Sequence, residues 1–141
     1  MADQSSIWQK PISLEWLKSF CDESMVSHIG ITFTDFGPNY LVATMPVDDR
    51  TRQPIGLLHG GASVALAETI ASTAAYCSVG EDHFTVGIEI NANHVRKVES
   101  GIVTGIARPV HLGSTTHVWE THITDEADRL ICISRMTLSV L

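Results

Sequence analysis

The segment that most constrains the fold is residues 56 to 72, GLLHGGASVALAETIAS, which is rich in glycine, alanine and serine. A helix with so little side-chain volume lets another backbone approach it closely. Further alanines follow, and the run stops before Gly80, a residue type common just after the end of a helix. The sequence therefore predicts one long helix, from about residue 59 to 79, with a sheet wrapped tightly around it.

The segments on either side of this helix have the composition of strands. IGITFTDF and YLVATMPV precede it, and four β-rich runs follow it, at residues 83–96, 101–113, 114–126 and 129–141. Short turns separate these last runs, which predicts a meander. A short amphipathic helix, at about 13–23 and capped by Ser13, comes before the first strand. This order indicates an α+β fold in which an antiparallel sheet covers one central helix.

The overall composition narrows the class of protein. With 141 residues, 44% of them hydrophobic, we expect one domain, 1–141. Nine scattered basic residues against sixteen acidic ones give a net charge of −7, which argues against nucleic acid as a partner. We recognise no signal peptide or bilayer-spanning stretch, and Cys21, Cys77 and Cys132 lie far apart. We therefore expect a cytoplasmic location and no membrane partner.

Glu68 is the one carboxylate within the small-residue run. Among Ala65, Leu66 and Ile70 it would lose hydration unless a partner compensated, which is costly for a charged group. That cost favours a functional reason for the residue. The pattern alone also allows the simpler arrangement, in which Glu68 belongs to a solvent-facing stripe with Ser63 and Ser72.

The start of the helix carries a second chemical signal, His59-Gly60-Gly61. Helix N-termini leave backbone N–H groups unpaired, and glycine lets a polarised carbonyl or an oxyanion come close to them. The glycines also fit a tight turn with no further role. If both Gly60 and Glu68 act on one group, a single helix cannot supply them, because eight residues at helical rise separate them by roughly 12 Å. Two antiparallel copies can, which predicts a site at a dimer interface.

A family resemblance adds to this interpretation. QPIGLLHGGASVALAETIAS, with GIEINANHVR and RPVHLGSTTHVWE further on, resembles the hotdog-fold acyl-CoA thioesterases of the phenylacetate-degradation type. Within them the chain is most similar to the bacterial aroyl-CoA branch, which contains 1,4-dihydroxy-2-naphthoyl-CoA thioesterases and proofreading thioesterases acting on aryl carrier proteins. The resemblance covers about residues 12–141. It implies a sheet of five or six strands around the helix, and dimers that pair into tetramers.

The resemblance also assigns catalytic roles. Glu68 matches the family's catalytic carboxylate, which acts as a nucleophile or as a general base on water. Gly60 matches the residue whose N–H polarises the thioester carbonyl. Three further positions match residues that support this chemistry: His59, Gln53 and Ser72.

Substrate binding is implied in the same way. His94 and Arg96 match positions that line the thioester and the CoA arm, and Gly87 is placed with them. His111 and Ser114, in the HLGS loop, match the site of the CoA phosphates or nucleotide, although close relatives often have a basic residue after HLGS, where Thr115 stands here. CoA is part of the substrate, so we expect no cofactor. We also expect no metal, since the seven histidines show no zinc-ligand spacing.

Other functions fit parts of the sequence. GASVA, at residues 61–65, imitates a serine hydrolase elbow, but residues 48–58 are polar or turn-like where that motif needs a buried strand. A hotdog dehydratase places its histidine and acid differently. A thioesterase acting on an acyl or aryl carrier protein and a non-catalytic acyl-CoA-binding hotdog protein remain alternatives. We prefer an aromatic acyl group as substrate, in a pocket lined by residues such as Met25, Val26, Ile55, Leu58, Ala71, Ala75 and Tyr76.

Overall fold

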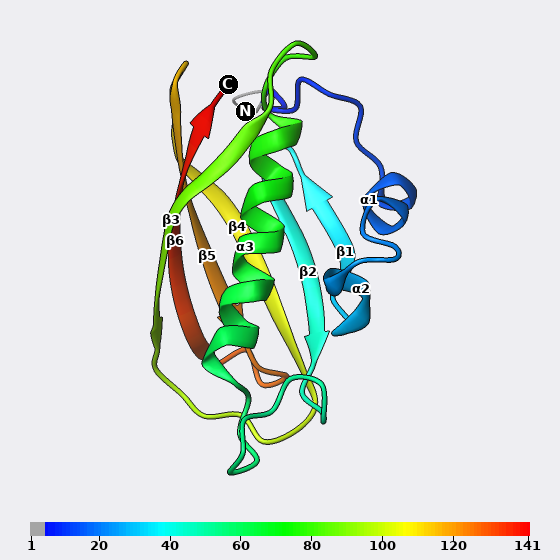
Figure 1. Ribbon diagram of the computed structural model, residues 1–141, viewed down its shortest axis with the longest axis vertical. Helices are drawn as coiled ribbons and strands as arrows, with labels where there is room; N and C mark the ends of the chain where they lie inside the picture. Colours follow the sequence, from blue (N-terminus) through cyan, green and yellow to red (C-terminus); the bar gives the residue numbers. More distant parts are fainter. Residues whose placement is uncertain (1–4) are drawn as a thin grey trace.

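A computed structural model describes residues 5–141 and shows a six-stranded antiparallel sheet curved around one long helix (Figure 1). The helix is α3 (Gly60–Cys77). The strands, in the order β1-β2-β4-β5-β6-β3 across the sheet, are β1 (Thr32–Gly37), β2 (Tyr40–Pro46), β4 (Ile102–Leu112), β5 (Thr116–Thr124), β6 (Leu130–Val140) and β3 (Thr85–His94). The predicted α+β fold with one sheet-wrapped helix is confirmed.

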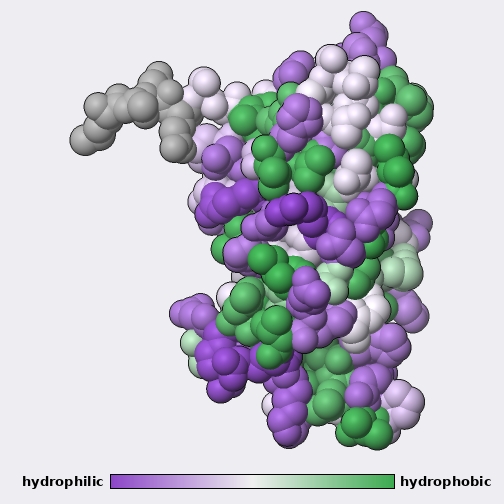
Figure 2. All heavy atoms as spheres, turned by 90° about the vertical axis from the view of Figure 1, so that its left-hand side faces the viewer, coloured by the Kyte–Doolittle hydropathy of each residue, from purple (hydrophilic) through white to green (hydrophobic). Residues whose placement is uncertain are grey.

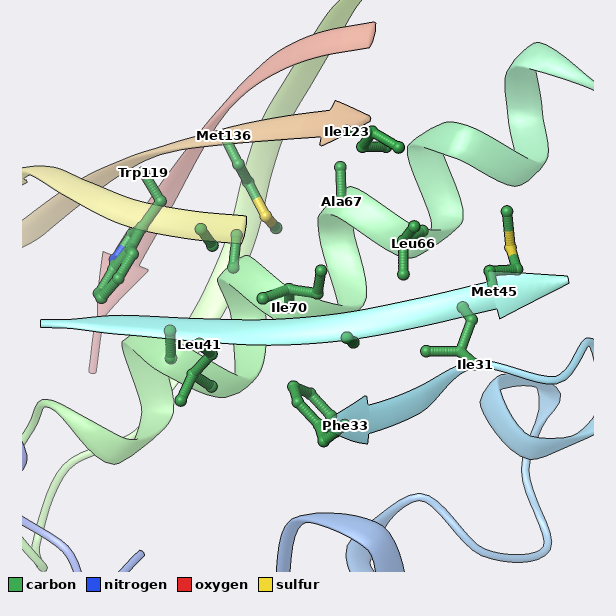
Figure 3. Close-up of a cluster of buried hydrophobic side chains, with 14 of the residues drawn as sticks. Ile31, Phe33, Leu41, Met45, Leu66, Ala67, Ile70, Trp119, Ile123 and Met136 are labelled. Atoms are coloured by element: carbon green, nitrogen blue, oxygen red, sulfur yellow. The ribbon is translucent and has the colours of Figure 1, made fainter. Parts of the chain in front are cut away.

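The core lies between α3 and the concave face of the sheet (Figure 3). Every second residue of β5 points into it, from His117 through Trp119 to Ile123, because side chains alternate across a strand. The close approach expected of the small-residue helix is present as well. A Cβ placed on Gly105 of β4 would lie 2.7 Å from Cδ1 of Ile70, so a larger residue there would have to displace the end of that side chain.

Two faces of α3 meet different surroundings. Leu66, Ala67, Ile70 and Ala71 are buried against the sheet, whereas Glu68 is exposed in the single chain. The expectation that apolar neighbours would surround Glu68 is therefore wrong, because the residues beside it in sequence turn to the opposite face of the helix. Two members of the alternative stripe do face outward, but the third is wrongly placed, since Ser63 is buried.

The strand order differs from the predicted meander at one strand. β4, β5 and β6 are neighbours, but β3 pairs with β6 at the far edge of the sheet, and β4 pairs with β2. The connection at residues 95–101 explains the difference. It is not a hairpin turn, and the carbonyl of its Val98 accepts a hydrogen bond from the N–H of Leu58 in the loop before α3. This carries the chain across to the other half of the sheet.

The N-terminal helical segment is shorter than predicted and divided in two. Ser13 caps α1 (Leu14–Phe20) as predicted, because its hydroxyl accepts a hydrogen bond from the N–H of Trp16. Glu23 then adopts a left-handed backbone with φ 55°, which no helix continues through, and α2 (Met25–His28) starts anew. Over residues 5–141, no helix combines the length and apolarity needed to cross a bilayer.

Lys10 ties the segment before α1 to the far end of α3. Its ammonium group is buried and lies within 2.8–3.2 Å of four backbone carbonyl oxygens, those of Tyr76, Val79, Gly80 and His83. These carbonyls include the unpaired acceptors that every helix leaves at its C-terminus. The positive charge of Lys10 also interacts favourably with the negative, C-terminal end of the helix dipole.

Candidate active site

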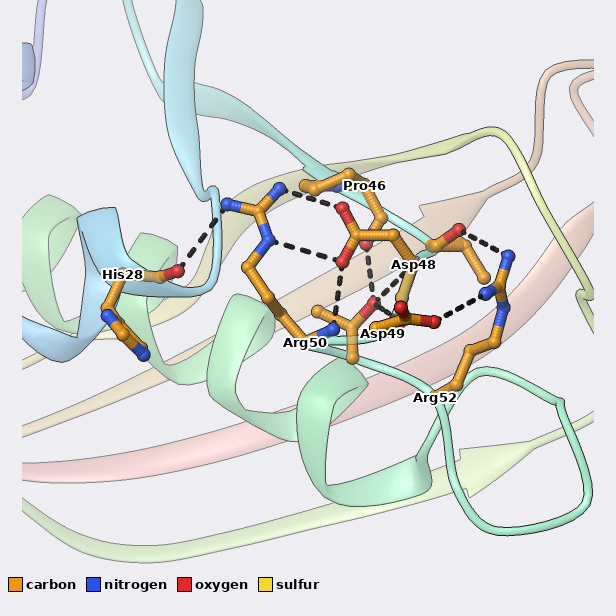
Figure 4. Close-up of polar contacts among 8 residues, drawn as sticks. His28, Pro46, Asp48, Asp49, Arg50 and Arg52 are labelled. Atoms are coloured by element: carbon orange, nitrogen blue, oxygen red, sulfur yellow. Dashed lines mark hydrogen bonds and ion pairs between the residues drawn. The ribbon is translucent and has the colours of Figure 1, made fainter.

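The loop between β2 and α3 is braced before the helix begins (Figure 4). Arg50 pairs with Asp48 at 2.7 Å, and its hydrogen bonds lower the pKa of that carboxyl group. Thr51 is buried, and its hydroxyl donates to the carbonyl of Pro46 at 2.7 Å. The carbonyl of Thr51 accepts a hydrogen bond from the N–H of His59 at 2.8 Å, so the first turn of α3 is fixed relative to β2.

The first two N–H groups of α3 differ in their partners. His59 caps the helix, because its Nδ1 accepts a hydrogen bond from the N–H of Gly61 at 2.8 Å. Within residues 5–141, no acceptor takes the N–H of Gly60. A free N–H at a helix N-terminus sits in partial positive charge, which suits an oxygen that carries or develops negative charge.

Four of the predicted residues meet at this helix start. Gly60 lies against His94, close enough that a Cβ on Gly60 would be 2.9 Å from Nε2 of that histidine. Both residues line a cavity of about 420 Å³ together with Gln53 and Arg96. We call it the helix-start cavity. The structure thus brings together residues from the β2–α3 loop, from α3 and from the end of β3.

Glu68 opens onto a different space, which we call the Glu68 groove. It has a volume of about 520 Å³ and runs between α3 and the segment that carries α1 and α2. Its lining residues are Phe20, Cys21, Ser24, Met25, Val26, Gly61, Val64, Ala65, Glu68, Thr69, Ser72 and Thr73. Ser72 follows Glu68 by one turn on the same face, and its hydroxyl lies 3.6 Å from the sulfur of Met136.

Gly87 of β3 lies beside the carboxylate of Glu68. A Cβ on Gly87 would stand 3.6 Å from Oε1 of Glu68 and 2.6 Å from Cε of Met136. The pairing of β3 with β6 shifts by one residue between Gly87 and Glu89, so a bulge occurs at this point of the strand. The missing side chain of Gly87 thus lets the end of Met136 and the Glu68 carboxylate come close to the strand backbone, next to the bulge.

The HLGS loop lies at the other end of α3. Ser114 lines a cavity of about 550 Å³ with residues that follow α3, such as Ser78 and Gly80, whereas His111 folds back over the turn. His117 lines the same cavity and was not anticipated. It is buried, its Nδ1 has no hydrogen-bond partner among the described residues, and burial followed by the charge of His111 lowers its pKa.

Within one chain the predicted site residues therefore form three separate groups. Gly60 and Glu68 are eight residues apart on one straight helix, roughly 12 Å by helical rise, and they line different cavities. Ser114 lines a third cavity, with residues that follow the C-terminal end of α3. A single chain consequently offers an acid and a free backbone N–H that cannot act on the same atom.

The predicted pocket lining is right in part. Met25 and Val26 line the Glu68 groove. Ala71 and Ala75 are buried in the core instead, because they lie on the sheet-facing side of α3. The other three expected residues also lie outside the groove: Leu58 lines the helix-start cavity, Tyr76 contacts Lys10, and Ile55 is exposed on the loop.

Several groove residues were missed. Ala65, Thr69 and Thr73 follow the same helical spacing as Glu68 and Ser72, so the period of the helix could have identified them. Phe20 and Cys21 had no such signal, because only the folded chain brings α1 beside α3.

The serine hydrolase alternative loses support. Ser63 is a buried residue in the first turn of α3, and a loop precedes it, so it does not form the exposed strand-to-helix elbow of a serine hydrolase. In the part of the chain that the structure describes, no three His, Cys, Asp or Glu side chains are grouped to hold a metal ion.

The sheet wrapped around α3 defines a hotdog protein, with a free N–H at the start of this helix and an acid at its middle. Comparison with known proteins identifies its family. The Thioesterase superfamily matches residues 55–132, from the loop before α3 into β6. The chain belongs to this family and is a thioester hydrolase.

Similar proteins extend the match to nearly the whole chain. It is 52% identical to the 1,4-dihydroxy-2-naphthoyl-CoA hydrolase of Escherichia coli, over 96% of this chain and 99% of that one. It is 47% identical to the proofreading thioesterase EntH of Cronobacter sakazakii, over 96% and 98%. The crystal structure of a thioesterase from Haemophilus influenzae superposes with a TM-score of 0.94 at 51% identity, covering 96% of this chain and 94% of that one.

Proposed function

We propose that the protein hydrolyses aromatic acyl-CoA thioesters to the free acid and CoA, at sites that two copies of the chain build together. The observation that carries this proposal is the place of Glu68. It is the only acidic residue of a groove whose remaining lining is apolar, small or uncharged, and the missing side chain of Gly87 lets its carboxylate lie close to the backbone of β3. The similarity to a 1,4-dihydroxy-2-naphthoyl-CoA hydrolase supports an aromatic acyl group.

In this proposal the free N–H of Gly60 polarises the thioester carbonyl. The same donor binds more strongly as negative charge develops on that oxygen in the tetrahedral state, which lowers the barrier. His59 and Gln53 support the donor. His59 does so by fixing the first turn through its hydrogen bond to the N–H of Gly61.

Glu68 of the other copy then supplies the oxygen chemistry. By one route its carboxylate attacks the carbonyl carbon and expels the CoA thiolate, leaving a mixed anhydride that water hydrolyses. By the other route it takes a proton from a water molecule that attacks the carbonyl directly. Both routes end in the free acid and CoA, and Ser72, one turn away, can hold the water. Thioesters are activated acyl donors, so neither route needs a metal.

We propose that β3 supplies the contact between the two copies. It is an edge strand with one unpaired side, and Val86 and Ile88 on it are exposed apolar residues. Figure 2 looks onto this side of the molecule, where hydrophobic residues alternate with hydrophilic ones. An antiparallel β3–β3 pair across a two-fold axis would bring the Gly60 end of one helix toward Glu68 of the other. Pairs of dimers would give the tetramer.

The remaining substrate contacts belong to the CoA arm. His94 and Arg96 stand beside Gly60 in the helix-start cavity, where Arg96 adds positive charge for a phosphate. His111 and Ser114 of the second copy would hold the nucleotide. We also propose a cytoplasmic location, since the three cysteines are free and CoA is an intracellular substrate.

A substrate panel tests the proposal. The purified protein is assayed with benzoyl-CoA, acetyl-CoA, palmitoyl-CoA and a benzoyl thioester of an aryl carrier protein, and kcat/KM is compared. We expect benzoyl-CoA to give the highest value. Equal values for acetyl-CoA and benzoyl-CoA would refute an aromatic preference. If the carrier-protein thioester gives the highest value, the carrier protein and not CoA is the natural carrier of the acyl group. No thiol release from any of them would refute the proposed reaction.

A further inference from the structure

One wall of the Glu68 groove carries an aromatic ring that is largely exposed to solvent. Phe20, at the end of α1, is 56% exposed although it is a large apolar residue. It lines the groove together with Met25 and Val26, on the side opposite the small residues of α3. α1 and α2 flank α3 on the side away from β3 (Figure 1). The groove therefore has an apolar wall facing the wall that carries Glu68.

The exposed ring is held in place by two others. Phe20 stacks on Trp16 with ring centroids 4.9 Å apart and an interplanar angle of 22°, and on Tyr76 at 6.1 Å and 10°. Trp16 and Tyr76 lie 6.4 Å apart at 14°, so all three rings are nearly parallel. The offset stacking of such pairs is favourable beyond the area that they bury.

The stack is anchored on both elements that carry it. Tyr76 belongs to the last turn of α3, and the ammonium group of Lys10 sits 4.4 Å from its ring centroid. Four carbonyl oxygens fix that ammonium group in turn. On α1, the fully buried Leu17 holds the helix that carries Trp16 and Phe20. Phe20 is thus exposed to the groove without being free to move, so binding to it costs little side-chain entropy.

We infer that Phe20 selects aromatic acyl groups by direct ring-to-ring contact, and that Trp16 and Tyr76 are positioning residues that hold its ring. The inference rests on the proposed function, because it takes the acyl group of the thioester as the occupant of the groove. An acyl ring between the two walls meets Phe20 on one side while Glu68 faces it from the other. A planar ring gains the aromatic pair, whereas a saturated ring of the same size gains only apolar contact.

The test compares an aromatic and a saturated six-membered acyl ring. Benzoyl-CoA and cyclohexanecarbonyl-CoA have the same number of carbon atoms, and their different intrinsic reactivity cancels when wild type and a variant are compared, so the change in the ratio of their kcat/KM values isolates the ring contact. Phe20→Leu keeps an apolar side chain but removes the ring, and we expect it to lower this ratio by roughly three- to tenfold. Phe20→Tyr keeps the ring and should keep the ratio within about twofold of wild type. Trp16→Leu should lower it less than Phe20→Leu does.

Phe84→Leu serves as the matched control. Phe84 is 50% exposed, close to the exposure of Phe20, and lies outside the groove, so the same chemical change should leave the ratio unaltered. Thermal unfolding of each variant checks the fold. An unchanged ratio in Phe20→Leu, or an equal change in Phe84→Leu, would overturn the inference.

Binding separates this inference from the proposed reaction. The non-hydrolysable thioether analogues of CoA that carry phenacyl and cyclohexylcarbonylmethyl groups are titrated calorimetrically into the same variants. The ratio of their Kd values should shift in Phe20→Leu as the kinetic ratio does. If wild type binds both analogues but hydrolyses neither thioester, the proposed function fails and the Kd ratio still decides the role of Phe20. If wild type hydrolyses both and neither ratio shifts, the role of Phe20 alone is refuted.

Discussion

His94 packs its imidazole ring against Gly60, so that a Cβ at position 60 would stand 2.9 Å from Nε2 of the histidine. The contact is with the far end of a side chain that can rotate, so Gly60→Ala should fold. Alanine is also the better helix former. Its methyl group and the displaced imidazole would crowd the space in front of the free N–H. We expect kcat/KM for benzoyl-CoA to fall by roughly tenfold or more, since a single lost oxyanion donor commonly costs more than that.

The melting temperature of Gly60→Ala is the control for this effect, and it should stay within a few degrees of wild type. A variant with full kcat/KM would show that the helix start does not contact the reacting carbonyl.

The separation of Gly60 from Glu68 leads to a prediction about mixed chains. If each site takes Gly60 from one copy and Glu68 from the other, a dimer of one Gly60→Ala chain with one Glu68→Gln chain has one intact site and one doubly altered site. Equal mixing with free exchange then restores roughly a quarter of the wild-type sites. Activity is measured before and after exchange, which is followed with a tag on one chain. Complete exchange without recovery would place the whole site within one chain.

Lys10 should matter more for stability than any exposed lysine. Replacing it with methionine leaves buried carbonyl oxygens at the end of α3 without their charged donor. We expect Lys10→Met to lower the free energy of unfolding by about 3 kcal/mol. Lys18→Met, at an exposed position on α1, is the matched control and should change it by less than about 0.5 kcal/mol. Denaturant unfolding measures both, and equal midpoints would contradict a structural role for the Lys10 ammonium group.

The cysteines should be unreactive in the folded protein. Burial raises the pKa of the Cys77 thiol to about 11, and it also raises the pKa of Cys21 and Cys132. Since thiolates are the reactive form, a thiol reagent at pH 8 should label the three cysteines fully only after denaturation.

The raised pKa of Cys77 also sets a direction for stability at alkaline pH. The buried, protonated thiol of Cys77 contributes fully to the free energy of unfolding below its ordinary pKa of 9.0. This contribution is lost as the pH rises through about 11. Unfolding midpoints should therefore fall over that interval, and a Cys77→Ala variant should show a smaller fall. In the labelling experiment described above, rapid reaction of the native protein at pH 8 would contradict the burial and protonation of the three thiols.

Local patterns predicted much of this structure. The six strands and α3 lie where the alternation and the small-residue run placed them, because β-branched strands and alanine-rich helices have strong local signals. The strand order had no such signal. β3 reaches the far edge through residues 95–101, whose hydrogen bond from the N–H of Leu58 to the carbonyl of Val98 is a long-range contact. Nothing within β3 itself encodes that partner.

The candidate site shows the same division. The chemistry of a helix N-terminus and of an acid among alanines predicted His59, Gly60 and Glu68 as site residues, and the structure puts Gln53, His94 and Arg96 in one cavity with Gly60. The environment of Glu68 was predicted wrongly, because its exposure depends on which face of α3 the sheet covers. Phe20 was missed, since its place in the groove depends on how α1 docks.

The central claim is that the carboxylate of Glu68 carries out the chemistry, and Glu68→Gln tests it most directly. The amide keeps the shape of the side chain but is neither a useful nucleophile nor a base. The measurement is kcat for benzoyl-CoA, accompanied by the Kd of the phenacyl thioether analogue and the oligomeric state. We predict a fall in kcat on the order of a hundredfold or more, with Kd nearly unchanged. A folded, oligomeric Glu68→Gln protein that keeps most of its kcat would contradict the account.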